Sequence, residues 1–165
     1  MVELVDAHVV RPLRHAVLRP GWPAPESVYP DDDDPRSAHV AVRRAAEVLS
    51  VATVLSVGTV LSVGTVLCEA PPWEPDRSDG WRVRGMATRP DARRRGFGGL
   101  VLDALMDHTA ARGGGLVWCN ARVAARRLYV RAGFVTRGPV FDLPGIGPHS
   151  QMWRTVGPMG RTVTD

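Results

Sequence analysis

The chain has 165 residues, of which 44% are hydrophobic, enough for one domain with a buried core. Its net charge of +4 comes from arginine alone, since the sequence contains no lysine. A basic surface of this kind attracts nucleic acid, anionic lipid or a polyphosphate cofactor, and it is equally consistent with a compositional habit of the genome. Cys68 and Cys119 lack metal-ligand spacing and no secretory segment is recognisable, which argues against a disulfide framework or a metal site. We therefore expect a cytoplasmic protein with reduced thiols.

The N-terminal segment predicts a strand followed by an amphipathic helix. Residues 2–5 are expected to form the strand, and Asp6 offers an N-cap for the helix. Pro12 must start or kink that helix, and Pro20 with Gly21 ends it. The apolar stripe of the helix consists of Leu13, Val17 and Leu18.

A proline-rich segment, residues 20–35, has no apolar period and predicts a surface loop. Its acidic run, residues 31–34, is expected to be a solvated turn rather than a metal site. Residues 38–42 then predict a second strand.

A hexamer of the pattern Ser-Val-Ala/Gly-Thr-Val-Leu occurs three times in tandem over residues 50–67. No charge lies between Val48 and Cys68, so length and hydropathy would admit a transmembrane helix. We reject that reading because β-branched residues dominate the run and Ser, Thr and Gly interrupt it. A single strand of this length would span about 65 Å, so the run must bend, loop out or form an extra hairpin. We interpret the repeat as a tandem duplication inside one strand, with no chemistry of its own.

The second half of the chain predicts strands and helices in alternation. Residues 81–88 alternate as a strand with Val83, Gly85 and Ala87 on one face, and Gly85 suggests a bulge. Residues 100–112 predict a helix whose apolar face consists of Val101, Leu102, Leu105 and Met106. The remaining expected elements are a buried strand at 116–119, a helix at 123–132 and two strands at 134–141 and 151–156. This order predicts a mixed α/β sheet in one domain, residues 1–157, followed by a tail at 158–165.

An arginine-glycine loop, residues 93–99, lies between the predicted strand and the helix that follows it. Glycines let a backbone approach phosphate, and the first amides of a helix point at an anion bound there. The Gly-Lys-Ser/Thr ending of a Walker loop is absent, and a dinucleotide fingerprint starting at Gly96 would need glycine in place of Val101. The loop is thus a candidate phosphate site, although a simple helix-initiating turn has the same pattern.

Three segments together resemble the GNAT superfamily of N-acetyltransferases. Residues 93–98 are similar to its Arg/Gln-x-x-Gly-x-Gly/Ala motif, which binds the pyrophosphate of acetyl-CoA. Residues 85–90 look like the end of its fourth strand, whose exposed backbone pairs with pantetheine. Residues 120–134 are similar to its Asn-x-x-Ala-x-x-x-x-Tyr-x-x-x-Gly-Phe segment.

The resemblance implies a mixed, mostly antiparallel sheet flanked by helices, in which a splayed strand pair forms the acetyl-CoA cleft. It implies direct transfer of an acetyl group from acetyl-CoA to a primary amine. The N–H of Met86 or Ala87 would stabilise the thioester oxygen, and Tyr129 would protonate the departing thiolate. The acetyl-CoA-binding residues that it implies are Met86, Ala87, Thr88, Arg93, Arg94, Arg95, Gly96, Phe97, Gly98, Gly99, Asn120 and Tyr129.

The residue that would act as general base is not identified by the family pattern, because this chain departs from it on the fourth strand. Many relatives place a glutamate on the fourth strand, whereas this strand offers only Arg82 and Arg84. His149 has the most suitable ordinary titration range, and a water chain is an alternative. The carboxylate candidates are Glu69, Glu74, Asp79 and Asp142.

Three functions remain open from the sequence. The first is an acetyl-CoA-dependent N-acetyltransferase acting on a small-molecule or protein amine, with a homodimer compatible with it. The second is a GNAT-like module that binds CoA without turnover, because the strand carboxylate is missing. The third, a basic nucleic-acid binder, is disfavoured because the arginines are scattered and no known nucleic-acid motif occurs; no membrane partner is expected either.

Overall fold

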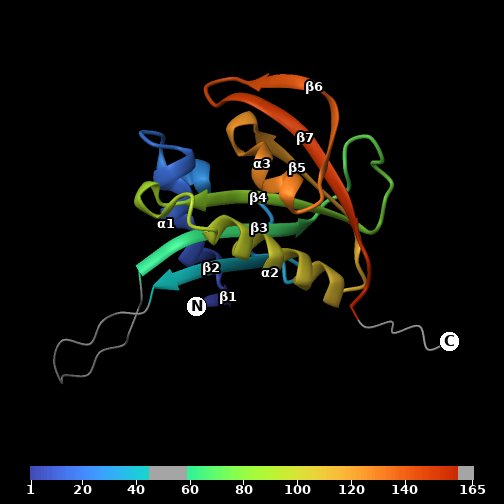
Figure 1. Ribbon diagram of the computed structural model, residues 1–165, viewed down its shortest axis with the longest axis horizontal. Helices are drawn as coiled ribbons and strands as arrows, with labels where there is room; N and C mark the ends of the chain where they lie inside the picture. The colour runs from blue at the N-terminus through green and yellow to red at the C-terminus, as the bar shows by residue number, and fades with distance from the viewer. Residues whose placement is uncertain (45–58, 160–165) are drawn as a thin grey trace.

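The structure is a computed structural model that describes residues 1–44 and 59–159. Figure 1 shows one sheet with helices against it. The strands are β1 (Val2–Val5), β2 (Ala38–Arg44), β3 (Thr59–Cys68), β4 (Gly80–Thr88), β5 (Gly115–Arg122), β6 (Val135–Leu143) and β7 (Gly147–Val156). The helices are α1 (Ala7–Leu18), α2 (Phe97–Ala111) and α3 (Arg126–Arg131), with short 3₁₀ turns η1 (Ala24–Ser27), η2 (Pro90–Ala92) and η3 (Val123–Ala125).

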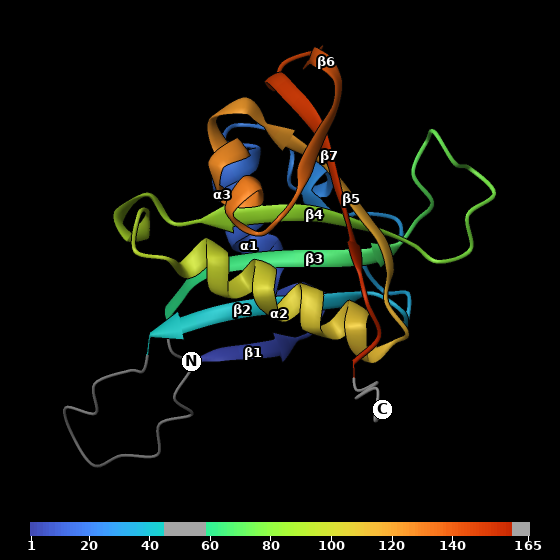
Figure 2. The same cartoon turned by 45° about the vertical axis from the view of Figure 1, so that its right-hand side comes forward.

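The seven strands form one mixed sheet in the order β1-β2-β3-β4-β5-β7-β6. Every neighbouring pair is antiparallel except β4 and β5, which are parallel. The β4–β5 ladder covers only residues 80–82 against 116–118, although both strands continue beyond it. Figures 1 and 2 show β1–β4 lying side by side while β5–β7 run at a steep angle to them. The predicted mixed, mostly antiparallel sheet is thus confirmed.

Helix α2 covers one face of the sheet, where the larger part of the core lies. Val101, Leu102 and Leu105 are fully buried there, as the apolar period predicts. Tyr129 of α3 and Phe134 belong to the same cluster, so α3 lies on this face too. Figure 2 shows α2 and α3 in front of the sheet with α1 behind it.

Helix α1 covers the opposite face, and Pro12 lies inside it rather than at its start. Val10 is fully buried against Val63 and Ala87, and Leu13 and Val17 pack on the same small cluster. Asp6 occupies the N-cap position without a side-chain hydrogen bond. Helix α1 packs on β3 and β4, the central strands of the sheet, and its last residues, Val17 and Leu18, lie beside β4.

The acidic run contains one buried carboxylate, which corrects the expectation of a solvated turn. Asp32 is 3% exposed and accepts two hydrogen bonds from Arg14 Nη1, at 2.9 and 2.8 Å. Arg14, itself 1% exposed, also donates to Thr65 Oγ1 at 2.7 Å. The sequence pattern missed this because the partner cation lies 18 residues earlier, on a helix face that otherwise packs apolar side chains. Asp32 therefore anchors the loop at residues 20–35 to α1.

The bulge predicted at Gly85 is present, but it changes which side chains share a face. Gly85 has φ +62°, and the register shifts so that both Gly85 and Met86 oppose Gly64 of β3. The extra residue reverses the alternation. Val83 and Met86 consequently pack on the α2 side, whereas Ala87 packs on the α1 side. The prediction that Val83 and Ala87 share a face is wrong for this reason.

The third copy of the hexamer repeat lies in β3, which pairs with β2 and β4. Residues 45–58, which include the first copy, lie outside the described residues, as does the predicted bend or hairpin there. Within the described part of the chain, no helix is long and apolar enough to cross a membrane.

Candidate active site

A cavity of about 400 Å³ opens where the β4–β5 ladder stops. Its walls come from both faces of the sheet: Val17 and Leu18 of α1 on one side, Leu128 and Tyr129 of α3 on the other. This is possible only because β4 and β5 are unpaired beyond Arg82. Backbone N–H and C=O groups on that edge of β4 are therefore free to bind an extended ligand.

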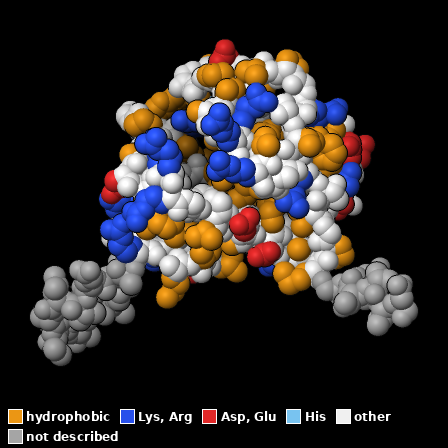
Figure 3. Space-filling view, viewed as in Figure 1, with side chains coloured by type: hydrophobic (Ala, Val, Ile, Leu, Met, Phe, Trp, Pro, Cys, Tyr) orange, Lys and Arg blue, Asp and Glu red, His pale blue; other side chains and the backbone are white. Residues whose placement is uncertain are grey.

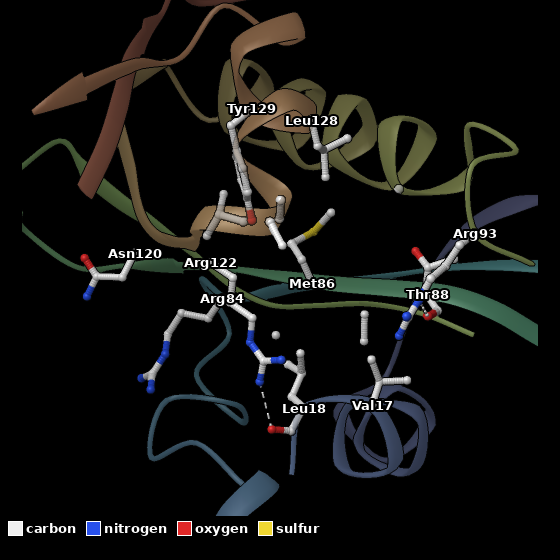
Figure 4. Close-up of a pocket in the computed structure, with 16 residues that line it drawn as sticks. Val17, Leu18, Arg84, Met86, Thr88, Arg93, Asn120, Arg122, Leu128 and Tyr129 are labelled. Atoms are coloured by element: carbon white, nitrogen blue, oxygen red, sulfur yellow. Dashed lines mark hydrogen bonds between the residues drawn. The ribbon is translucent and has the colours of Figure 1, made fainter. Parts of the chain in front are cut away.

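The cavity is elongated (Figure 4). Thr88 and Arg93 lie at one end, Asn120 and Arg84 lie at the other, and Met86 is between them. The hydroxyl of Tyr129 points into the middle from α3. We call this space the first cavity.

The arginine-glycine loop stands at the Arg93 end and leads into α2. Gly96 is the N-cap with φ +85°, a left-handed conformation that favours glycine. The first intrahelical bond runs from the Leu100 N–H to the Gly96 carbonyl at 3.2 Å, so the amides of residues 97–99 have no partner within the helix. Unpaired amides and the positive end of a helix dipole together form an environment that suits an anion such as phosphate.

Tyr129 is 5% exposed and contacts Phe134 edge-on, with ring centroids 5.5 Å apart. Burial raises the pKa of its phenol well above the ordinary value, and the Cys119 side chain adds to the rise. Burial also raises the pKa of the Cys119 thiol to about 12. The phenol is therefore protonated at every working pH and acts as a hydrogen-bond donor.

A second, smaller cavity of about 120 Å³ adjoins the first. Arg84 and Asn120 belong to the walls of both, and Asn120 Oδ1 is buried without a hydrogen-bond partner. His149 lines the second cavity, and its Nδ1 lies 2.7 Å from the Gly147 carbonyl. Because a carbonyl only accepts, Nδ1 carries the proton and Nε2 carries the lone pair of the neutral ring.

The structure brings many of the predicted site residues together. The following predicted residues line the first cavity: Met86, Ala87, Thr88, Arg93, Gly98, Asn120 and Tyr129. Arg94, Arg95 and Gly96 are exposed on the loop beside it, with Arg95 stacked over Phe97 at 5.5 Å. Gly99 follows in the first turn of α2.

The carboxylate candidates for the general base lie elsewhere. Glu69 pairs with Arg82 at 2.6 Å, and neither cavity is lined by it. Glu74 and Asp79 both pair with Arg77, and Asp142 is exposed on β6. Among the candidates in the described residues, only His149 lines a cavity. The described part of the chain contains no group of three or more His, Cys, Asp or Glu side chains that could hold a metal ion.

Sequence reasoning gave no site role to several residues that line the first cavity. Val17 and Leu18 come from α1, far from any motif, and nothing in the sequence places that helix against β4. Arg122 lies two residues after Asn120 and donates from Nη2 to the Leu18 carbonyl at 3.1 Å. In the sequence, Arg84 shows only that the strand lacks the glutamate that many relatives have. Its position in both walls is a result of the tertiary structure.

The model of the Acetyltransferase (GNAT) family matches residues 14–134, which run from within α1 to the residue before β6 and include every residue that lines the first cavity. The chain belongs to the GNAT family of N-acetyltransferases. It is 28% identical over 157 residues to the uncharacterized N-acetyltransferase YitI of Bacillus subtilis (strain 168), covering 94% of the chain and 95% of that protein.

Two solved structures show the same GNAT fold. The ribosomal-protein-S18-alanine N-acetyltransferase from Escherichia coli matches with a TM-score of 0.67 at 15% identity, covering 100% of this chain and 99% of that one. An aminoglycoside 6'-N-acetyltransferase in complex with coenzyme A matches with a TM-score of 0.63 at 14% identity, covering 97% and 99%. At such low identities the likeness concerns the fold alone.

Proposed function

We propose that this GNAT enzyme transfers an acetyl group from acetyl-CoA directly to a primary amine, with both substrates bound at once. The observation that carries the proposal is the first cavity, which runs from the free amides of α2 to Tyr129 and Asn120. The α2 amides and Arg93 would hold the pyrophosphate, and the free edge of β4 would pair with pantetheine. The second cavity then leaves room for the acceptor beside the thioester.

In the proposed reaction the amine nitrogen forms a bond to the acetyl carbon, and the carbon–sulfur bond breaks. The N–H of Met86 stabilises the charge that develops on the acetyl oxygen, because Ala87 is paired with Val63 of β3 and turns its own N–H toward that strand. His149 Nε2, or a water beside it, takes the proton that frees the amine lone pair. Tyr129 gives its phenolic proton to the leaving sulfur, the nitrogen loses its second proton to solvent, and solvent returns a proton to the Tyr129 oxygen.

The test of this proposal has two parts. Calorimetry should show that acetyl-CoA binds, and addition of an amine panel should cause amine-dependent release of the CoA thiol. Binding of acetyl-CoA without any release of thiol would favour the alternative function, a CoA-binding module that lacks turnover. This alternative is tested because, within the described residues, no Asp or Glu lines either cavity.

Replacing Tyr129 with phenylalanine should lower kcat by about 10- to 100-fold, because the leaving sulfur loses its hydrogen-bond donor. The Kd for acetyl-CoA should change far less, since the ring and its packing remain. Steady-state kinetics with calorimetry measures both quantities. An unaltered kcat would remove Tyr129 from the chemistry.

Replacing His149 with glutamine should lower kcat/KM by about tenfold or more, the lower end of general-base effects. Glutamine fills similar space but accepts no proton. The matched control is His8→Gln, because His8 is exposed on α1 and lines neither cavity. Equal rates in the two variants would show that water alone serves as the base.

A further inference from the structure

The second cavity is lined by cationic side chains and by no carboxylate among the described residues. Arg19, Arg82 and Arg84 contribute to its wall, together with Asn120 and His149. Figure 3 shows arginine side chains gathered around a hollow in the upper half of the molecule. A cavity with this lining disfavours cations and attracts an anion.

Arg84 and Arg19 form no ion pair within the described residues, but Arg19 donates a hydrogen bond to the Leu18 carbonyl, whereas the Arg84 guanidinium has no such acceptor. Arg82 pairs with Glu69, and the nearby Arg14 pairs with Asp32. Within the described part of the chain, Arg84 has no carboxylate within 4.0 Å and no side-chain hydrogen bond; its guanidinium stacks on the Tyr29 ring at 4.0 Å. Arg14 stacks on the same ring at 4.1 Å, which holds Tyr29 between the two guanidiniums. Five N–H donors of a partly buried cation are thus left for a ligand.

The environment of Arg84 makes this charge costly without a ligand. Burial lowers the pKa of its guanidinium, and repulsion from Arg82 and Arg14 acts in the same direction, while attraction to Tyr29 and Glu69 offsets only part of this. An anion placed in the second cavity would remove that cost and could form a bidentate pair.

The phosphates of CoA do not account for this charge. The proposed pyrophosphate site lies at the Arg93 end of the first cavity, whereas Arg84 lies at the opposite end beside Asn120 (Figure 4). Arg84 and Asn120 are where the two cavities meet, so an anion held by Arg84 stands next to the position of the thioester.

We propose that the second cavity binds the carboxylate or phosphate group of the acceptor, so that the preferred substrates are small amines that carry an anionic group. This inference rests on the proposed function. Arg84 holds the anion, Arg19 adds to the field, and the unpartnered Asn120 Oδ1 accepts a hydrogen bond from the amine. A volume of about 120 Å³ limits the group that enters to a small one, since a water occupies about 30 Å³ of liquid.

Arg19, whose charge remains when Arg84 pairs with the anion, favours the reactive form of the acceptor. Positive charge near an ammonium group lowers its pKa, so the bound amine loses its proton more readily. A lower amine pKa reduces the demand on the base, His149 or water, that takes the proton. Polyamines and aminoglycosides, which lack an anionic group, are expected to be poor acceptors.

The test compares acceptors in matched pairs at saturating acetyl-CoA. Amino acids are compared with their carboxamides, and phosphoethanolamine with ethanolamine; spermidine represents the polycations. We expect the anionic member of at least one pair to show kcat/KM about tenfold or more above its neutral partner. A preference within the amino acid pairs identifies a carboxylate as the bound group, and a preference for phosphoethanolamine over ethanolamine identifies a phosphate.

Variants of Arg84 connect the preference to the residue. Arg84→Gln should lower kcat/KM for the anionic acceptor about tenfold or more and bring the ratio between the members of the pair close to one. Arg84→Lys should keep part of the preference, because the charge remains without the planar fork. The control Arg127→Gln removes an exposed arginine that lines neither cavity and should leave the ratio unchanged.

Two outcomes separate the inference from the function on which it rests. Acetyl-CoA binding combined with a preference for carboxamides or spermidine, or with no use of any anionic amine, would overturn the anionic-acceptor inference alone. Failure to bind acetyl-CoA would overturn the proposed function and the inference with it.

Discussion

Replacing Gly98 with valine is expected to weaken acetyl-CoA binding by about 100-fold or more, a loss of about 2.7 kcal/mol. Gly98 lines the first cavity at its phosphate end. A Cβ there would lie 3.5 Å from Leu128 Cδ2 and 3.6 Å from Thr88 Oγ1, which is ordinary contact. The fold should therefore accept the change, while the added methyl groups occupy the space where phosphate must approach the α2 amides.

The control for Gly98→Val is Gly157→Val, because a side chain at Gly157 meets nothing within 4 Å and its φ is not positive. Calorimetric titration with acetyl-CoA measures both variants, and thermal unfolding confirms that both are folded. Unchanged affinity in Gly98→Val would refute the placement of the pyrophosphate at this loop.

Replacing Asp32 with alanine is expected to lower the free energy of unfolding by about 3–5 kcal/mol, the usual result of breaking a buried ion pair from one side. Arg14 would remain buried without its carboxylate, and the Tyr29 N–H would lose its acceptor at 3.1 Å. Urea unfolding measures the change. Asp33→Ala is the control, because the Asp33 side chain is 83% exposed and a pair of this kind contributes little. Equal losses in both variants would contradict the role of the buried pair.

The stabilising effect of Asp32 should also depend on pH. Burial by itself raises the pKa of this carboxyl, but hydrogen bonds from Arg14, the Tyr29 amide and Arg11 outweigh it, so the folded-state pKa is lowered. A lowered folded pKa means that the stabilisation is complete above the unfolded value of about 3.9 and is lost as pH falls through the folded pKa. The difference between the wild type and Asp32→Ala should therefore be constant near neutral pH and shrink in acid.

The elements of the fold follow from local patterns. The apolar spacing of Val101, Leu102 and Leu105 predicted α2 and its buried face, and the glycines that follow predicted its end. Gly85 predicted a bulge because only a residue without Cβ accepts its φ easily. The shift of faces beyond that bulge was missed, because strict alternation assumes an uninterrupted strand.

The sequence by itself determined the motifs from which the acetyl-CoA side of the site is proposed. Residues 93–99 predict the start of a helix whose free amides suit phosphate, because turn and helix geometry depends on neighbouring residues. Asn120 and Tyr129 follow at the spacing found in the GNAT family. Only the tertiary structure decided the rest. The burial of Asp32, the walls that Leu18 and Arg122 contribute, and the uncompensated charge of Arg84 depend on contacts between segments far apart in the chain. Such contacts are set by the packing of α1 and β5 against β4, and no local pattern encodes them.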